Sequence, residues 1–291
     1  ALALLAIGCS AKDASVVDQP GTESRCEGST FLRFFPEPEP SVREQYVCFA
    51  FDASDLAGAA LDAVFWSDPL GGTVLHHATL LTTEQELETG VPLSCDPMPQ
   101  DVEAVHVWSP GGDDLRFPEG VALELSSTTR RFLIEAHVVR KSDAPAGEAR
   151  VELCPARAEP LHLAARIGIS AQVPALRPHF VEISSTRCRL PEAWHLLSAW
   201  PHMHKVGSAF QSALWRGEER IPIVDLPRWD FNHQRTYELD LQAEAGDVVE
   251  TTCIWENPNS EYVLPGPLTE NEMCTFGLTG YPREAARCEA E

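Results

Sequence analysis

Short runs of alternating apolar and polar residues are the feature that most constrains how this chain can fold. Such runs are typical of half-buried strands, because successive side chains point to opposite faces of a sheet. In the first half they are QYVCFAFD, AVFWSD, TVLHHATLL, AVHVWS, VALELSS, RFLIEAHVV and RVELC. In the second half they are HFVEISS, HLLSAWPHMH, FQSALWRG, RTYELDLQ and VVETTCIW. With 23 prolines and 18 glycines as turn residues, the sequence predicts an all-β protein.

The strand pattern lapses at CPARAEP, residues 154–160, between halves of similar size. A chain of 291 residues is long enough for two cores of ordinary size. We therefore expect two tandem antiparallel β-sandwiches, an N-terminal one over residues 26–157 and a C-terminal one over residues 158–291. Residues 1–25 precede them as a separate segment.

This N-terminal segment resembles an export signal followed by a tether. The apolar residues ALALLAIG lead directly into Cys9, and LAIGCS resembles a bacterial lipobox. Processing there would leave Cys9 as the lipidated first residue of a lipoprotein; an ordinary cleaved signal with an incidental cysteine is the alternative. The residues that follow are small and polar. We expect an exported protein held on the periplasmic or cell-surface face of a bacterial membrane only by a lipid anchor.

Cysteine count and charge limit the compartment and the partners. The eight cysteines other than Cys9 are an even number, which indicates four disulfides in an oxidising compartment. No CxxC pair is present, so a zinc ribbon or an iron–sulfur cluster has no support. The formal charge of −22 argues against nucleic acid as a partner and against electrostatic binding to a membrane.

Three compact histidine settings supply candidate metal ligands. They are the adjacent pair His76 and His77, the single His137, and the pair His202 and His204. Two histidines at i and i+2 of an extended segment project to the same side, which is a common way to offer two ligands to one metal. Met273, one of three methionines, directly precedes Cys274.

The chemistry of these side chains favours copper. Imidazole suits zinc, copper and iron, whereas a thioether is a soft ligand that favours Cu(I). A hydrolytic zinc site more often includes a carboxylate. Alternatives stay open at this point, because a lone strand histidine is commonly structural and Met273 alone would be core packing. The rings of His76 and His77 would diverge on a regular strand, so sharing a metal requires a bulge or bend.

Eight segments occur in the order found in a known family. They are EQYVC, VLHHATLL, FPEGVALEL, FLIEAHVV, PHMHKVG, WDFNHQ, GDVVETTCIW and NEMCTFG, and they lie between about Cys26 and the end of the chain. Through them the sequence resembles the copper type II, ascorbate-dependent monooxygenase family, that of peptidylglycine α-hydroxylating monooxygenase and dopamine β-monooxygenase.

The resemblance implies a fold and two copper sites. The first copper stores and delivers electrons, and its ligands match His76, His77 and His137. The second is the catalytic copper, where O₂ binds and a substrate C–H bond is hydroxylated, and its ligands match His202, His204 and Met273. The coppers would lie on separate, jelly-roll-like β-sandwiches that face a solvent-filled cleft. Ascorbate or another one-electron donor would reduce both.

The resemblance also implies the cysteine pairs. They are Cys26–Cys154, Cys48–Cys95, Cys188–Cys288 and Cys253–Cys274. The last pair would anchor the backbone next to Met273. Five histidines match no ligand of the family and are interpreted as structural: His106, His162, His179, His195 and His233.

The substrate-binding residues of the peptide-amidating members are not matched. Their arginine before the His-x-His motif corresponds here to Trp200 or Pro201, and their tyrosine after the Met-Cys pair corresponds to Gly277. An entrance lined by tryptophan and poor in charge favours a neutral or apolar small molecule. No segment resembles the fused lyase domain of the amidating enzymes or the extra domain of dopamine β-monooxygenase, so we expect the bare catalytic core on a lipid tether.

The leading hypothesis is a monooxygenase that uses copper, O₂ and ascorbate or a similar donor to hydroxylate a small molecule. The alternative is a non-catalytic copper-binding protein for storage, sensing or delivery. A recognition sandwich with vestigial sites is a third possibility. Ligand sets at both sites favour the enzyme, because a carrier would need only one.

Overall fold

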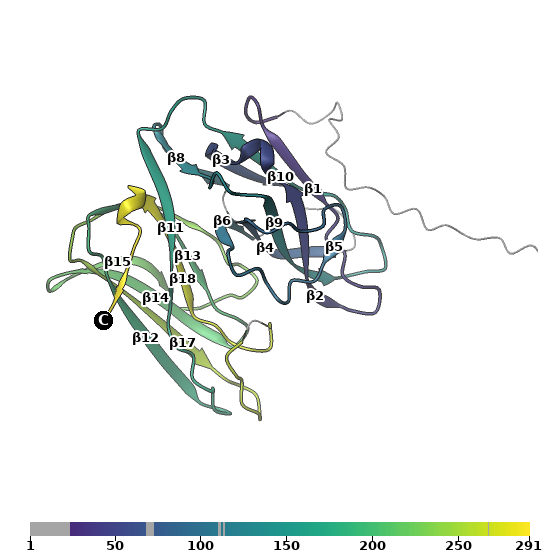
Figure 1. The fold of residues 1–291 in the computed structure, drawn as a ribbon. Coiled ribbons are helices and arrows are strands. Elements are labelled where there is room, and N and C mark those ends of the chain that lie inside the picture. The colour runs from purple at the N-terminus through teal and green to yellow at the C-terminus, as the bar shows by residue number, and fades with distance from the viewer. Residues whose placement is uncertain (1–23, 68–72, 110–111, 113, 267) are drawn as a thin grey trace, which may run out of the picture.

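The computed structural model describes residues 24–67, 73–109, 112, 114–266 and 268–291 (Figure 1). The predicted lipidation site at Cys9 lies outside the described residues. Within them the chain forms strands and two single-turn 3-10 helices, at Ser54–Leu56 and Arg283–Ala285, which confirms the all-β class. In this described part, no helix has the length and apolar character needed to cross a membrane.

The first half of the chain forms two facing sheets. One has the strand order β5-β2-β9-β4-β6. Its strands are β2 (Glu44–Asp52), β4 (Thr73–Thr83), β5 (Pro92–Leu93), β6 (Glu103–Trp108) and β9 (Arg131–Arg140). The other contains β1 (Thr30–Phe34), β3 (Ala60–Ser67), β7 (Leu115–Arg116), β8 (Val121–Glu124) and β10 (Ala149–Pro155). Apolar side chains from both sheets form one buried cluster that includes Leu32, Phe49, Leu80 and Ile134.

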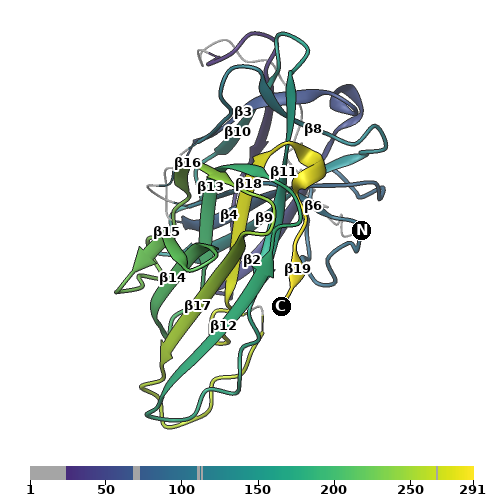
Figure 2. The same ribbon diagram turned by 90° about the vertical axis from the view of Figure 1, so that its left-hand side faces the viewer.

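The second half forms a similar pair of layers. One sheet has the order β15-β14-β17-β12-β19, three of whose strands, β14, β17 and β12, lie side by side in Figure 2. Its strands are β12 (Val181–Arg189), β14 (Gly207–Arg216), β15 (Glu219–Leu226), β17 (Val248–Glu256) and β19 (Glu289–Ala290). The facing strands are β11 (His162–Ser170), β13 (Trp194–His202), β16 (Tyr237–Ala243) and β18 (Thr275–Tyr281). A second buried cluster between them includes Phe210, Trp255 and Phe276.

One sheet is shared by the two halves, which the sequence did not indicate. Its order is β1-β10-β3-β8-β11-β18-β13-β16, and β8 joins β11 in parallel through the pairs His162–Val121 and Ala164–Leu123. The start of β11 therefore continues the first sandwich, and its later residues pair with β18 of the second. The domain boundary at residues 157 and 158, which falls between β10 and β11, stays a prediction.

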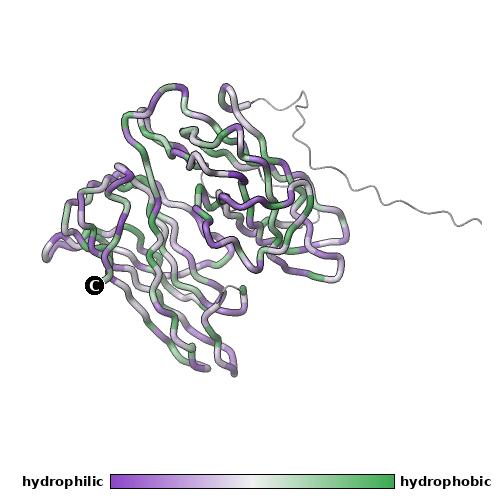
Figure 3. Tube along the Cα trace, in the orientation of Figure 1, coloured by the Kyte–Doolittle hydropathy of each residue, from purple (hydrophilic) through white to green (hydrophobic). Residues whose placement is uncertain are grey.

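The strand interiors explain why these segments fold as sheets. Hydropathy changes from residue to residue along most strands rather than in long blocks (Figure 3). In β12, for example, the burial alternates over Val181–Arg189 because only one of its faces meets the core. The strands β2, β4 and β9 carry longer buried runs, because their sheet is covered on both faces. One face packs on the main cluster, and on the other Cys48, Leu81 and Leu133 pack against residues of the segment 87–102.

Four disulfides connect the described residues: Cys26–Cys154, Cys48–Cys95, Cys188–Cys288 and Cys253–Cys274. These are the pairs that the family resemblance implied. Each lies within one half of the chain. Four disulfides in a chain of this length are typical of a protein that folds in an oxidising, exported environment.

Candidate metal centres

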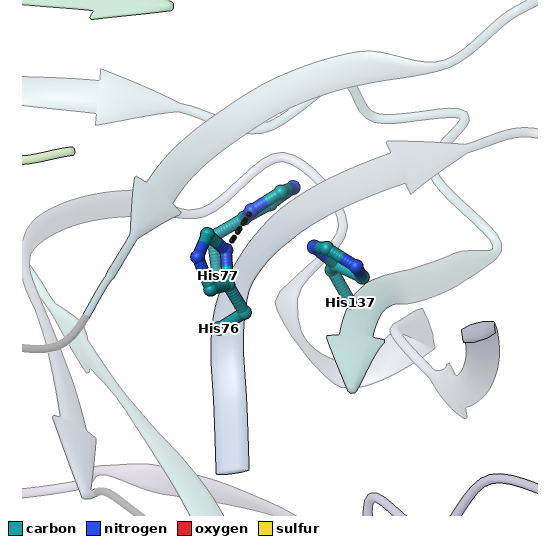
Figure 4. Close-up of side chains that lie close together, drawn as sticks. All are labelled: His76, His77 and His137. Carbon is teal, nitrogen blue, oxygen red and sulfur yellow. Dashed lines mark hydrogen bonds between the residues drawn. The ribbon is translucent and has the colours of Figure 1, made fainter. Parts of the chain in front are cut away.

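The first histidine set lies on two neighbouring strands of the first half. His76 and His77 belong to β4 and His137 belongs to β9, and the register places His77 opposite His137. The β4–β9 register shifts between Leu75 and His77, so His76 is the extra residue of an irregularity in the strand. This irregularity is the feature that adjacent histidines need in order to face one metal. Figure 4 shows the three side chains gathered from the two strands.

The ring nitrogens of this set converge. One ligand atom from each histidine lies within 4.8 Å of the others, and Nδ1 of His76 is 3.2 Å from Nδ1 of His77. Nε2 of His76 donates to Asn232 at 3.3 Å, which leaves its Nδ1 as an acceptor. Two ring nitrogens at that separation need a proton or a metal ion between them. Nδ1 of His77 can carry that proton, and a metal ion bound by both nitrogens would take its place.

The imidazole of His137 is oriented by a hydrogen bond to the carboxylate of Glu44. Its Nε2 donates to Glu44 Oε1 at 2.9 Å and lies 3.3 Å from the Thr269 hydroxyl. The ring also stacks on Tyr46, with centroids 4.5 Å apart and an interplanar angle of 6°. Its Nδ1 is buried and has no hydrogen-bond partner among the described residues. A buried nitrogen without a partner is costly unless a ligand occupies the position it faces.

The second histidine set lies at the end of β13. His202 is the last residue of that strand, and His204 follows two residues later. Nδ1 of His202 donates to Gln234 Oε1 at 2.6 Å, and Nδ1 of His204 donates to the carbonyl of Asn271 at 3.0 Å. Nε2 of both rings is thereby left as the acceptor, and Nε2 of His204 is buried with no partner in the described part of the chain.

A buried carboxylate ties Met273 to this set. Glu272 accepts hydrogen bonds from the backbone N–H of His204 at 3.0 Å and of Val206 at 2.8 Å. It also accepts from Trp255 Nε1 at 3.0 Å and from the backbone N–H of Met273 at 3.3 Å. The side chain of Glu272 therefore fixes the backbone of both His204 and Met273. The Cys253–Cys274 disulfide anchors the next residue.

Burial keeps all five imidazoles neutral. Desolvation, together with the neighbouring histidines, lowers the pKa of His202 to about 3 and that of His137 to about 4. The pKa of His77 also falls well below its usual value, and those of His76 and His204 fall as well, each mainly through burial. Neutral imidazole is the form that binds a metal, so no proton has to be displaced at pH 7.

The two sets are in contact, which differs from the solvent-filled separation that the resemblance implied. The ring centroids of His77 and His202 lie 5.8 Å apart, and these side chains are only 6% and 5% exposed. Phe231 contacts both sets: its ring stacks on His76 at 4.4 Å and lies 6.2 Å from His204. Side chains rather than water therefore fill the space between the sets at this point.

The segment 229–234 of the second half carries this contact. Trp229 Nε1 donates to the carbonyl of His204 at 3.1 Å. Phe231 packs on His76, Asn232 accepts from the same ring, and Gln234 holds His202. One short loop therefore supports both histidine sets.

A cleft remains open beside the second set. Its volume is about 1000 Å³, and residues of both halves line it, among them Val107 and Leu125 of the first half. Trp200 lines it from β13 and stacks on His202, with centroids 4.9 Å apart and an interplanar angle of 16°. The expected position of Trp200 and Gly277 at a substrate entrance is consistent with this cleft, which both residues line.

The five remaining histidines lie outside both sets. His106 is buried near Trp66, and His233 pairs with Asp230 on the surface at 2.7 Å. His162 and His195 stack on Tyr281. The last, His179, has a left-handed backbone with φ of 56°.

Sequence reasoning did not identify the residues that orient the candidate ligands. Glu44 lies in EQYVC, Gln234 in WDFNHQ and Glu272 in NEMCTFG, so all three belong to segments that carry the family resemblance. Their residue types and positions in those segments were the available signal. Their partners lie far away in the sequence, for example 93 residues for Glu44 and His137, and no local pattern reports such a pairing.

Comparisons with known proteins concern mainly the second half. The family model described as copper type II ascorbate-dependent monooxygenase, C-terminal domain, matches residues 176–290. That range contains His202, His204 and Met273, and the first histidine set lies outside it. No curated protein matches the chain significantly. Among solved structures, allantoicase matches with 8% identity and a TM-score of 0.22, covering 78% of this chain and 77% of that chain, a likeness too low to support any argument.

Proposed function

We propose that this chain is a copper-dependent monooxygenase that hydroxylates a C–H bond of a small organic molecule. The reaction consumes O₂, two electrons and two protons, places one oxygen atom in the product and releases the other as water. Ascorbate or another one-electron donor supplies the electrons in two steps. The observation that carries this proposal is the converging neutral set of His76, His77 and His137, beside which lies a second neutral pair. The rings of that pair, His202 and His204, are 5.0 Å apart and lie inside the range of the monooxygenase family match.

The residues present fit copper at both positions. His76, His77 and His137 would hold one ion, with Nδ1 of His137 buried and without a partner among the described residues. His202, His204 and Met273 would hold the other, with Nε2 of His204 in the same situation. Bound copper would supply one-electron redox chemistry and a place for O₂. A neutral set that includes a thioether suits the reduced ion better than a hard cation.

The protein's own groups would fix the ligands and exclude water. Glu44, Gln234 and the carbonyl of Asn271 each accept a hydrogen bond from the ring nitrogen that faces away from the metal position. Such contacts fix the tautomer and the ring orientation of a ligand. Phe231 covers the space between the sets and limits the access of water to both.

The cleft beside Trp200 is the proposed substrate site. It is open, is lined by both halves of the chain and reaches the ring that stacks on His202. The sequence-based expectation of a neutral or apolar substrate rests on Trp200 and Gly277. Anchoring by a lipid on Cys9 in a bacterial membrane also belongs to the proposal, together with export of the chain.

The proposal is tested by turnover. The copper-reconstituted protein is incubated with ascorbate, O₂ and a panel of small organic molecules, and O₂ consumption is compared with hydroxylated product by mass spectrometry. We expect copper- and ascorbate-dependent product that contains one atom from ¹⁸O₂. Tight copper binding without hydroxylation of any panel member would favour the storage, sensing or delivery alternative.

A further inference from the structure

Arg166 is a cationic side chain in the proposed substrate cleft. It belongs to β11 and lines the cleft together with Trp200 and Gly277. Its Nη1 donates to the carbonyl of Val105 at 3.1 Å, across the boundary between the two halves. Its Nη2 lies 3.6 Å from the point where a Cβ on Gly277 would stand. The guanidinium therefore extends from its own strand over the neighbouring glycine.

This guanidinium has no carboxylate partner among the described residues. Nineteen ion pairs occur there, and none includes Arg166. Of the acidic residues lining the cleft, Glu124 pairs with Arg283 and Glu103 is exposed. Burial lowers the pKa of Arg166 to about 10, so the side chain is still cationic at pH 7. An unpaired, partly buried cation is unusual in a chain of charge −22.

The sheet leaves an open floor between Arg166 and the second histidine set. The register places Gly168, Gly277 and Trp200 side by side across β11, β18 and β13. Arg166 precedes Gly168 by two residues on one strand, and His202 follows Trp200 by two on another, so all five share one face. A Cβ on Gly168 would meet nothing within 4 Å. The face thus has a cation at one end, a floor without side chains, and an indole against His202.

We propose that Arg166 binds an anionic group, a carboxylate or its equivalent, of the substrate in this cleft. The proposal rests on the proposed function and replaces the expectation of a wholly neutral substrate. Guanidinium binds a carboxylate through two parallel N–H donors, which matches the planar acceptor in shape and charge. The apolar part of the ligand lies over Gly168 and Gly277 and packs against Trp200.

A structural clamp is the competing role for Arg166, because its hydrogen bond to Val105 joins the two halves. That bond uses one N–H of the five that a guanidinium carries. A clamp stabilises the contact between the halves through a hydrogen bond, and that role needs no positive charge. The two roles therefore differ in whether the cleft distinguishes a carboxylate from a neutral group of the same size.

The test measures binding, without turnover. Dissociation constants of 4-fluorobenzoate and 4-fluorobenzamide are measured by ¹⁹F NMR on the full chain at 0.15 M salt, with and without copper. These probes share ring and size and differ in charge. We expect the wild-type protein to bind the benzoate at least about tenfold more tightly than the amide, the usual advantage of a charge-assisted hydrogen bond.

Variants then show which residue causes the preference for the benzoate over the amide. Arg166→Gln should reduce it to less than about twofold, and Arg166→Lys should keep part of it because the charge remains. Arg283→Gln is the matched control, since Arg283 lines the same cleft but already pairs with Glu124 at 2.7 Å, and it should keep the full preference. Gly168→Leu, which keeps the arginine and fills the floor, should weaken binding of both probes.

Equal affinity of the wild-type protein for both probes would overturn the proposal, as would an unchanged preference in a folded Arg166→Gln protein. If Arg166→Gln does not fold, unaltered benzoate binding by Gly168→Leu overturns it instead. The outcome is separate from that of the proposed function. A benzoate preference without hydroxylation of any molecule would leave the anion site standing, and turnover of neutral molecules without such a preference would remove only the anion site.

Discussion

At the scale of single residues, each candidate ligand makes a hydrogen bond through one ring nitrogen. That bond decides which nitrogen is left to face a metal. Gln234→Leu keeps the volume but removes the acceptor of the 2.6 Å bond from His202. Loss of such a partner typically weakens metal binding by about 10–100-fold. We expect this loss at the second site only, measured by competition with a copper chelator. Gln242→Leu is the matched control because Gln242 contacts His195 in the same way, at 3.3 Å, outside both sets.

A substitution at Met273 would separate catalysis from mere binding of copper. A thioether holds Cu(I) well and Cu(II) poorly, so it favours the ion that reacts with O₂. Met273→Ile preserves apolar volume, and the free energy of unfolding should change by less than about 1.5 kcal/mol. Hydroxylation should nevertheless collapse, while copper at His76, His77 and His137 stays bound. Met98→Ile, in the first half, should leave the rate unchanged. A wild-type rate in Met273→Ile would make Met273 a packing residue.

Sequence patterns single out the candidate ligands, whose assignment stays a prediction, more readily than the residues around them. His202 and His204 are recognisable from their i, i+2 spacing, and the pair His76 and His77 from its adjacency. Glu44 and Arg166 gave no such signal, because each meets its partner across different strands of the folded chain. The pattern of a strand shows which face a side chain takes, but not which distant group it meets there.

At the scale of elements, the Cys253–Cys274 disulfide joins β17 to the residue that follows Met273. Replacing both cysteines by alanine should cost roughly 2–5 kcal/mol of unfolding free energy. It should also weaken copper binding at the second site, since the backbone of Met273 loses an anchor. The double alanine variant of Cys48 and Cys95 is the control.

The control variant should lose comparable stability in a urea titration and keep copper at the second site. Equal copper affinity in the two double variants would show that the Cys253–Cys274 bridge has no role in the site. Peptide mapping of the wild-type protein provides a direct check, because it should find Cys253 joined only to Cys274.

Alternation identified the strands well, and the connection between sheets poorly. The predicted runs FLIEAHVV and RVELC correspond to β9 and β10. The parallel pairing of β8 with β11 was not predicted, because the first residues of β11 look like any other strand residues. Period-two patterning reports a buried face and contains no information on the neighbouring strand.

At the scale of the whole molecule, the buried histidines make the stability of the copper-free protein depend on pH. His137 and His202, with pKa values of about 4 and about 3, stay neutral in the folded protein, whereas unfolded histidine titrates near 6.5. Below about pH 6.5 only the unfolded chain gains these protons. The unfolding free energy should therefore decrease as the pH is lowered below about 6.5, by up to about 1.4 kcal/mol per pH unit for each such histidine.

Urea titrations of the copper-free protein at pH 7, 6 and 5 measure this slope. Burial raises the pKa of Glu135 and Glu272. The contribution of these two carboxyls to the unfolding free energy therefore decreases as the pH rises, which is opposite to the effect of the histidines. Comparison with a variant that carries glutamine at His137 and His202 isolates the histidine contribution. The variant should show the smaller loss of stability on acidification; an equal loss would mean that these histidines are charged in the folded protein.

We propose that each half of the chain contributes one copper site to a joint centre. Copper per chain, measured by elemental analysis after reconstitution and removal of loosely bound metal, tests it most directly. We expect two ions in the wild-type protein and the second site still occupied in His137→Ala, which removes one of the three histidines of the first. A reconstituted wild-type protein that takes up no copper would contradict the account.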